Sequence, residues 1–441
     1  MTFREGLIKA RSSLVMLLGV VVAAAIVLGL ESFDLGATTR GFTVTRSADI
    51  PQPGSGPLGP TELAQARVAW KYFENNLQPA TGLVNSAENY PATTMWDTGS
   101  YLVALIAAHR LELIDRAELD RRLTLALGAL ARMPLFDASL PNKAYNTVTL
   151  ETVDYNNRPA PRGIGWSAID VGRLLVPFNI IVWNYPEHTG LIRPVLARWR
   201  TRQLARDGVM YGAALDAAGK TVYWQEGRLG YEQYSAKSFG LLGLDVTRAL
   251  RYDEFLQYVP IYGLDVPTDR RRPEEFGAHN SVVSEPYLLD GFEFGGDAIS
   301  REFAYRVYRA QEERFKRTGI LTAVSEDHLD QPPHFVYNAV FTAGKTWHAV
   351  TESGEDGSRF KTLSVKAAFG WDALYRTPYT ARLLEKVAPL HDPARGFWAG
   401  LYESTGAPNR ALAANTNAVV LESLHYRKFG PFLPLPGPRA D

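Results

Sequence analysis

The sequence predicts an all-α protein: an (α/α)6 toroid of helical hairpins with short β-hairpins in the loops, preceded by one N-terminal transmembrane helix. Apolar residues recur at helical spacing over most of the chain, and no sustained strand–helix alternation suggests a parallel βαβ sheet. A glycine follows a helix, or a short loop after one, in Thr81-Gly82, Asp207-Gly208, Thr318-Gly319 and Arg395-Gly396. Because each leads through a loop into another helix, we expect a closed ring whose loops converge on a central cleft.

The N-terminal segment, residues 1–30, predicts a membrane anchor. Arg4, Lys9 and Arg11 precede an uninterrupted apolar run that ends at Leu30 and is just long enough to span a bilayer. Because the positive residues come first, we expect the N-terminus in the cytoplasm and the body of the chain outside the inner membrane. A cleaved signal peptide is the alternative, since the run contains the small residues Ala23-Ala24-Ala25, but the run continues past them to Leu30 and favours an uncleaved anchor.

The rest of the chain divides into three parts. Residues 31–60 form a linker rich in Pro, Gly and Ser, residues 61–430 the toroid domain, and residues 431–441 a C-terminal tail. We expect helices over about residues 61–77, 96–113, 116–131, 166–184, 189–206, 229–248, 299–317, 363–388 and 411–428. Segments 209–212 and 221–224 predict a small β-hairpin.

The composition argues against several functions. The formal net charge is zero and no long basic run occurs, which disfavours nucleic acid as a partner. Cysteine is absent, which excludes thiolate metal sites, a cysteine nucleophile and disulfides. No HExxH, GxSxG, Walker A or dinucleotide motif is present, so we expect no metal and no cofactor. The glycine-rich segment 291–297 lacks the lysine of a phosphate loop, and we interpret it as a loop lining the cleft.

The stretch over residues 224–234 has the composition of a polar binding pocket. It combines two carboxylates, an arginine, an indole and two phenols, with Gly227 and Gly230 between them. Carboxylates accept hydroxyl hydrogens and aromatic faces stack on pyranose rings, so this mixture is typical of a site for a hydroxyl-rich ligand. The other interpretation is a surface helix start with a salt-bridged Arg228. The glycine and tryptophan neighbours of Glu226 are expected to desolvate it and raise its pKa.

Two further segments carry candidate residues. Trp96-Asp97 places an acid in the first turn of a helix, either as a cap or as a functional group. Spacings of four and three place Trp166, Asp170 and Arg173 on one helical face. We interpret them either as an ion pair between Asp170 and Arg173 or as part of a functional site.

Once metal, cofactor and nucleophile motifs are excluded, the remaining candidate chemistry is catalysis by carboxyl groups among aromatic residues. Hydrolysis of a glycosidic bond needs one carboxylic acid to protonate the leaving oxygen and one carboxylate as base or nucleophile. We assign Glu226 as the general acid, Asp97 or Asp170 as the group that activates water, and Glu232 as the alternative acid. The candidate substrate-binding residues are Trp96, Trp166, Tyr231 and Tyr234 for stacking, Arg173 and Arg228 for orienting carboxylates, and Glu403, Asn415 and Asn417 for binding hydroxyls.

Five ordered motifs carry a resemblance to a known family. They occupy residues 96–102, 140–146, 163–170, 225–234 and 414–422. Together they closely resemble a bacterial family catalogued as a domain of unknown function, number 3131, over roughly residues 61–430. The last motif also resembles that of glucoamylase-like (α/α)6 glucanases. The resemblance implies a helical toroid in bacterial envelope proteins and a role on polysaccharide, without an agreed substrate or catalytic pair.

We therefore hypothesise a membrane-anchored, periplasm-facing glycoside hydrolase that binds a polysaccharide in a central acidic, aromatic-lined cleft. A non-catalytic glycan-binding accessory of an envelope polysaccharide synthase is one alternative. A polysaccharide lyase is another, with Tyr234, His279 and Arg228 as its nominal catalytic set. A lyase should have a basic cleft to hold uronic acid carboxylates, and the motifs here are acidic.

Overall fold

The computed structural model describes residues 44–276 and 279–433. The chain divides into a unit of Met1–Arg46 and a compact unit of Ser47–Asp441, and the second unit contains the elements below. The expected membrane anchor lies outside the described residues. Within residues 44–276 and 279–433, no helix has both the length and the hydropathy required to cross a membrane.

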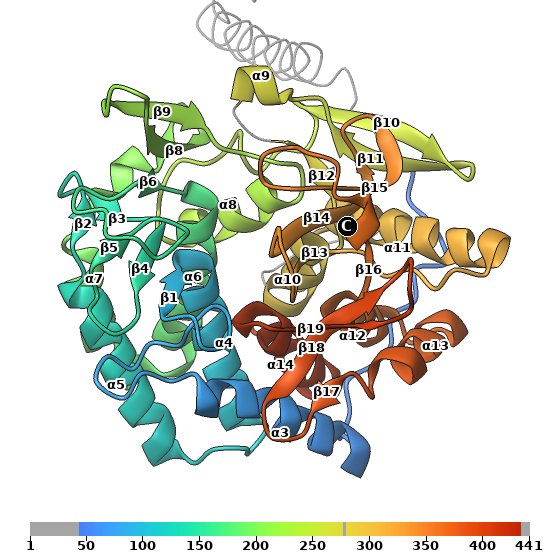
Figure 1. Ribbon diagram of the computed structural model, residues 1–441, viewed down its shortest axis with the longest axis horizontal. Coiled ribbons are helices and arrows are strands. Elements are labelled where there is room, and N and C mark those ends of the chain that lie inside the picture. The colour runs from blue at the N-terminus through green and yellow to red at the C-terminus, as the bar shows by residue number, and fades with distance from the viewer. Residues whose placement is uncertain (1–43, 277–278, 434–441) are drawn as a thin grey trace, which may run out of the picture. The chain divides into compact units, whose positions relative to one another are not determined.

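Within the described residues, six helices form a closed inner ring (Figure 1). They are α4 (Met95–Arg110), α6 (Ala168–Asn184), α8 (Tyr231–Leu241), α10 (Glu285–Phe294), α12 (Val365–Tyr375) and α14 (Ala414–Phe429). Each helix packs on the next in chain order, and α14 packs back on α4. In α4, nearly every residue as far as Ala108 is buried, as expected for a helix with neighbours on all sides. The expected toroid is therefore present.

An outer layer alternates with the ring along the chain. It consists of α3 (Pro60–Asn75), α5 (Arg116–Arg132), α7 (Thr189–Leu196), α11 (Ala298–Thr318) and α13 (Pro378–Val387), with 3₁₀ turns η1 (Pro186–His188), η2 (Thr201–Gln203) and η3 (Ser358–Phe360). Between α8 and α10, the described residues form the hairpin of β10 (Leu256–Ile261) and β11 (Leu264–Asp269) and the one-turn α9 (Pro273–Phe276). This hairpin stands where a sixth outer helix would be.

Four predicted elements need correction. The helix expected over 363–388 is two helices, α12 and α13, because Pro378 opens a new helix. Helices α7 and α8 are shorter than expected and end at Leu196 and Leu241. The segment 291–297, expected to be a loop, contains the C-terminal part of α10. The helix stops there because Gly295 adopts the left-handed conformation, with φ of 79°.

Short antiparallel sheets precede the inner helices. The first pairs β1 (Ala92–Thr94), β4 (Ala144–Asn146) and β5 (Thr152–Val153) in that order, and a separate ladder pairs β2 (Leu135–Phe136) with β3 (Leu140–Pro141). In the next sheet, β8 (Val209–Leu215) pairs with β6 (Gly165–Trp166), β7 (Ala205–Arg206) and β9 (Thr221–Gln225). The expected hairpin is the β8–β9 pair.

Two further sheets, of four strands each, complete the set. Strand β14 (Phe335–Thr342) pairs with β12 (Ser281–Val282), β13 (Glu326–His328) and β15 (Lys345–Val350). Strand β18 (Gly396–Tyr402) pairs with β16 (Thr362–Ser364), β17 (His391–Asp392) and β19 (Pro408–Leu412). Strands β1, β6, β16 and β19 lead almost directly into α4, α6, α12 and α14. The first turns of these inner helices therefore lie next to the sheets.

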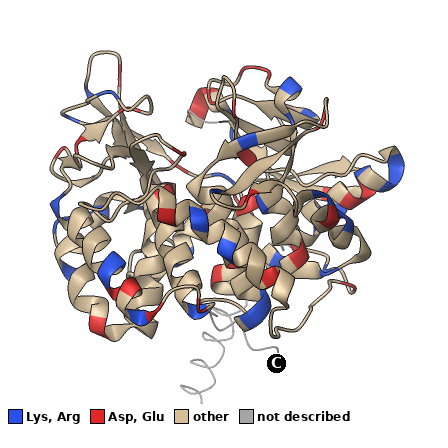
Figure 2. Ribbon diagram, turned by 60° about the horizontal axis from the view of Figure 1, so that its bottom comes forward, with Lys and Arg blue, Asp and Glu red and all other residues tan. Residues whose placement is uncertain are grey.

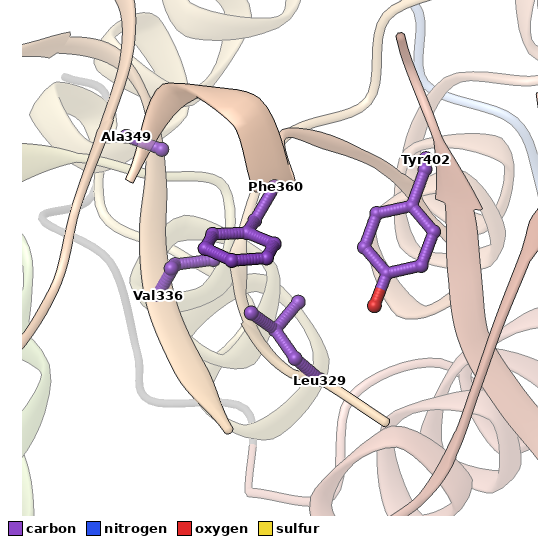
Figure 3. Close-up of a cluster of buried hydrophobic side chains, with 5 residues drawn as sticks. All are labelled: Leu329, Val336, Ala349, Phe360 and Tyr402. Atoms are coloured by element: carbon purple, nitrogen blue, oxygen red, sulfur yellow. The ribbon is translucent and has the colours of Figure 1, made fainter. Parts of the chain in front are cut away.

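A small apolar core joins the β14 sheet and the β18 sheet (Figure 3). Leu329, Val336, Ala349, Phe360 and Tyr402 are all buried and come from the β13–β15 region, η3 and β18. Their contacts hold the strand that carries Glu326–His328 in place.

Acidic and basic residues are interspersed along the described helices (Figure 2), in keeping with the formal net charge of zero.

Candidate active site

The first turns of the inner helices carry polar side chains. These residues, which we call the helix-start cluster, are Asp97 in α4, Asp170 in α6, Glu232 in α8, Glu285 in α10, Lys366 in α12 and Asn415 in α14. A helix N-terminus favours a carboxylate because its free N–H groups and its dipole are positive there. The preference explains why most members of the cluster are acids.

Glu285 joins several members of the cluster. It is fully buried, and its Oε1 accepts hydrogen bonds from Trp96 Nε1 at 3.2 Å and from Asn415 Nδ2 at 2.7 Å. Its Oε2 forms an ion pair with Lys366 Nζ. Side chains from α4, α10, α12 and α14 therefore meet at one carboxylate, and both of its oxygens are occupied.

Glu326, in β13, is partly exposed beside this group. The hydroxyl of Tyr231 donates a hydrogen bond to Glu326 Oε1 at 2.5 Å. Burial and the negative charge of Glu285 raise the pKa of Glu326 to about 7, although Lys366, the Tyr231 hydroxyl and Arg228 act in the opposite direction. Glu326 can therefore exchange a proton near neutral pH.

A second pair of carboxyls lies at the start of α6. Glu226, directly after β9, accepts hydrogen bonds from Ser167 Oγ and from the Ala168 N–H, both at 2.6 Å. Asp170 is partly exposed in the first turn of the same helix. Burial and the negative charge of Glu226 raise the pKa of Asp170 to about 7, against an opposing effect of Lys143. The hydrogen bonds hold Glu226 as an acceptor, while Asp170 keeps a proton.

Two residues connect these pairs electrostatically. The negative charge of Asp97 acts both on Asp170 and on His328 in β13. Tyr155 is 51% exposed as a residue; desolvation of its hydroxyl and the charges of Asp170 and Glu352 raise the pKa of its phenol. Because Coulombic effects weaken with distance, Asp97 lies near both the first turn of α6 and strand β13.

Several of the predicted site residues do meet in this region. They are Trp96, Asp97, Asp170, Glu226, Arg228, Tyr231 and Asn415. Arg228 lies over the ring of Tyr337, 5.3 Å from its centroid, and acts electrostatically on Glu326. Trp96 packs edge-on against Tyr231, with 5.4 Å between ring centroids. The roles assigned to these residues remain predictions.

Glu232 has different surroundings from those expected of an alternative acid. The residue is 2% exposed, and its Oε2 lies 2.7 Å from Arg271 Nη1, which also pairs with Asp269. Burial raises the pKa of Glu232 to about 7, while Arg271 acts against this rise. The pairing makes Glu232 part of a buried ion cluster, so its assignment as an acid acting on substrate is wrong.

Arg173 and Tyr234 belong to a network inside the ring. Arg173 is fully buried and forms ion pairs with Glu293 of α10 and with Glu422 of α14, the latter at 2.6 Å. Tyr234 of α8 donates to Glu293 Oε2 at 2.6 Å and accepts from Arg173 at 2.9 Å. Arg173 therefore does not form the ion pair with Asp170 that was one of the two interpretations of this segment. Neither Arg173 nor Tyr234 lies where it could bind substrate as predicted.

Three other predicted binding residues have structural roles. Trp166 lies in β6 instead of on the helix face and is 1% exposed, which rules out stacking on a sugar. Asn417 is buried, and its Oδ1 accepts a hydrogen bond from the Phe397 N–H at 2.8 Å, which positions β18. Glu403 pairs with Arg314 at 2.6 Å. For Trp166 and Asn417 the predicted contact with sugar is wrong, and Glu403 is held by its cation.

The sequence reasoning missed Glu285, Glu326 and Lys366. Glu285 follows Ser284 and precedes Pro286, a pattern typical of a helix start. Glu326 comes from a strand too short to show a period, although the run Ser-Glu-Asp-His in which it lies is unusually polar for a core segment. Among residues 44–276 and 279–433, no group of three or more acidic or histidine side chains is arranged to hold a metal ion.

A closed ring of inner helices that alternate along the chain with outer helices defines an α/α toroid. The chain belongs to the family described as Protein of unknown function (DUF3131), whose model matches residues 64–430. The comparison with curated proteins gave no match.

Solved structures of low sequence identity share this fold. A glucoamylase-like protein from Bacteroides caccae has a TM-score of 0.60 at 11% identity, covering 84% of this chain and 93% of its own. An endo-β-1,2-glucanase from Chitinophaga pinensis, with sophorotriose and glucose, has a TM-score of 0.59 at 12% identity, covering 85% and 94%. A mutant endo-β-1,2-glucanase from Talaromyces funiculosus, with β-1,2-glucan, has a TM-score of 0.53 at 11% identity, covering 85% and 84%. At such identities the likeness establishes the fold.

Proposed function

We propose that this protein is a glycoside hydrolase that cleaves a glucan by general acid–base catalysis. One observation carries the proposal: two partly exposed carboxyls, Asp170 and Glu326, have their pKa raised to about 7, and the charge of Asp97 acts both on Asp170 and on His328, which lies in β13 with Glu326. Each lies beside another carboxylate whose oxygens are held by hydrogen bonds. Paired carboxyls in unequal surroundings are the means by which a protein keeps one acid protonated at neutral pH.

The roles follow from these surroundings. Asp170 donates the proton to the leaving glycosidic oxygen, because its neighbour Glu226 is held as an acceptor by Ser167 and Ala168. Glu326 is the base or nucleophile, because Lys366, the Tyr231 hydroxyl and Arg228 all favour its ionised form. Glu226, our first choice for the acid from sequence, then supplies the negative charge that keeps the proton on Asp170.

Two observations support a neutral glucan as substrate. Solved structures of the same fold include glucanases that act on β-1,2-glucan. The negative charges of Glu226 and Asp97, which both act on Asp170, would also repel an anionic polysaccharide.

The test uses the full-length chain and a glucan panel of β-1,2-, β-1,3-, β-1,4- and α-1,4-linked polymers, with release of reducing ends as the measurement. We expect release from at least one polymer. Asp170→Asn and Glu326→Gln should each lower turnover by about 10²- to 10⁴-fold. Glu385→Gln, an exposed position on the outer helix α13, should act like the wild type. Wild-type turnover by both variants would disprove the assignment.

The non-catalytic alternative has its own outcome in this experiment. Binding of one glucan without release by the wild-type chain would support a glycan-binding accessory of an envelope polysaccharide synthase. The lyase alternative has less support, because its three residues are not brought together. Tyr234 is buried against Glu293, His279 packs against Gly354, and Arg228 stacks on Tyr337.

We infer an envelope location from the apolar run 14–30, with the inner membrane as a partner and the toroid domain on the periplasmic side. Alkaline extraction of membranes tests this location. An anchored chain stays in the membrane fraction, a cleaved chain is released, and N-terminal sequencing identifies the mature start. Recovery of an intact N-terminus in the soluble fraction would contradict both forms.

A further inference from the structure

The two faces of β9 have different surroundings. The register places Trp224 opposite Gly212 on β8. Side chains alternate along a strand, so Trp224 and Glu226 share one face while Tyr223 projects from the other. The ring of Tyr223 packs against Trp166, with 5.8 Å between centroids.

Gly212 keeps the face of Trp224 and Glu226 clear. A Cβ atom at position 212 would lie 2.4 Å from Glu226 Oε2, far closer than any real contact. The carboxylate of Glu226 therefore lies over β8 at the position directly opposite Trp224. From there it reaches Ser167 and Ala168 at the start of α6. The indole is thus a direct neighbour of the carboxylate that adjoins Asp170.

Trp224 has no packing role that would explain its size. It is 45% exposed, and within the described part of the chain no aromatic ring or cation stacks on it and its Nε1 makes no hydrogen bond. The indoles of Trp166 and Trp371, in contrast, are buried and donate to Tyr211 and Ser284. A large exposed indole beside a carboxylate is suited to a pyranose ring, whose C–H face stacks on the aromatic surface while its hydroxyls donate to the oxygen.

We propose that Trp224 is a stacking platform for one glucosyl ring of the substrate, in a subsite where Glu226 accepts a hydrogen bond from a sugar hydroxyl. The subsite adjoins Asp170 and so places the scissile bond relative to the acid. This inference rests on the proposed glucanase function for its substrate class. It assigns Trp224 to substrate positioning and leaves the proton transfer to the carboxyls.

The structure offers a matched pair of variants. Trp224→Ala and Tyr223→Ala change adjacent positions on one strand, each 45% exposed, but on opposite faces. Full-length variants are run by affinity electrophoresis through gels that contain each polymer of the glucan panel, and KM and kcat are measured on any polymer that is cleaved. Trp224→Ala should weaken retention and raise KM by about tenfold while changing kcat less. Tyr223→Ala should behave like the wild type, and Trp224→Phe should lie between.

The outcomes separate the platform from the catalytic assignment. If Trp224→Ala binds as the wild type does, or if Tyr223→Ala loses as much, the platform is disproved even where Asp170→Asn abolishes turnover. If Trp224→Ala alone loses retention while the carboxyl variants keep their turnover, the platform stands and the catalytic assignment falls. A wild-type chain retained by no polymer of the panel also overturns the platform. Trp224→Phe keeps the test valid if the alanine variant fails to fold.

Discussion

Two groups of carboxyls in the same toroid differ in the charges that surround them. Inside the ring, Glu293 and Glu422 share the guanidinium of Arg173, and all three side chains are fully buried. At the helix starts and in β13, Asp170 and Glu326 are partly exposed, and in each case the largest nearby charge effect comes from another carboxylate. The first group joins α6, α10 and α14. The second holds protons near neutral pH. The charge nearest to each group, a guanidinium in one case and a carboxylate in the other, is what distinguishes these two groups.

The largest effect should come from breaking the buried network. Arg173→Met removes the only cation that bridges Glu293 and Glu422 in the described residues, and leaves two buried carboxylates without compensation. We expect the free energy of unfolding to fall by about 3–5 kcal/mol, measured by urea denaturation. Arg67→Met, at an exposed position on α3, is the control. A loss below about 1 kcal/mol for Arg173→Met would mean that the network does not stabilise the ring.

The pH dependence of activity should be the next largest effect. Below pH 7 Glu326 gains a proton and can no longer act as a base, and above pH 7 Asp170 loses the proton that it must donate. We expect kcat/KM to peak near pH 7 and to fall by roughly 10- to 100-fold two units to either side. A profile that stays flat across this range would contradict the assignment of both groups.

The same shift predicts how stability responds to pH. The folded state binds the proton of Asp170 more tightly than the unfolded chain, where the pKa of an aspartate is about 4. The free energy of unfolding should therefore fall as pH rises from about 4 through 7, and Asp170→Asn should reduce this slope. At pH 8 the variant should be more stable than the wild type by about 1 kcal/mol or more.

Glu118 is a control for which the pH dependence of the free energy of unfolding has the opposite sign. A hydrogen bond from Arg121 is the largest cause that lowers its pKa, to about 2, so its contribution to stability is present above pH 4.5 and is lost as pH falls. Glu118→Gln should therefore destabilise the chain at neutral pH, while Asp170→Asn stabilises it. Variants that change stability in the same direction at pH 8 would contradict this difference between paired and unpaired carboxyls.

Much of the ring could be predicted from sequence because each helix carries its own period and boundary signals. The rotation of each helix about its own axis could not be predicted from the sequence. The spacing of Asp170 and Arg173 does place them on nearby positions of α6, but packing turns Arg173 toward Glu293 and Glu422 and leaves Asp170 at the rim. The loop predicted over residues 291–297 was wrong for a related reason. Its glycines suggested a loop, but the buried packing of α10 outweighs the weak helix preference of glycine.

The candidate site also contains residues that could be predicted from the sequence and residues that could not. Asp97, Asp170 and Glu226 could be found because helix starts and strand ends leave local patterns. Glu326 could not, because it lies in a three-residue strand and its site neighbours Tyr231 and Glu285 are far from it in the chain. Its partner Glu285 comes from α10, forty-one positions earlier in the chain. Long-range pairing therefore supplies half of the proposed catalytic pair.

The smallest effect concerns the one hydrogen bond that eases the ionisation of Glu326. The hydroxyl of Tyr231 donates to Glu326 Oε1 and lowers its pKa. Tyr231→Phe removes this donor but keeps the ring packed against Trp96, so the pKa of Glu326 should rise. The acidic limb of the activity profile should then move up by about 0.5 to 1 pH unit while the basic limb stays in place. Tyr305→Phe, whose hydroxyl bonds to Asp49, is the matched control. Movement of the basic limb alone would show that Tyr231 acts on the proton donor, which would reverse the roles of Asp170 and Glu326.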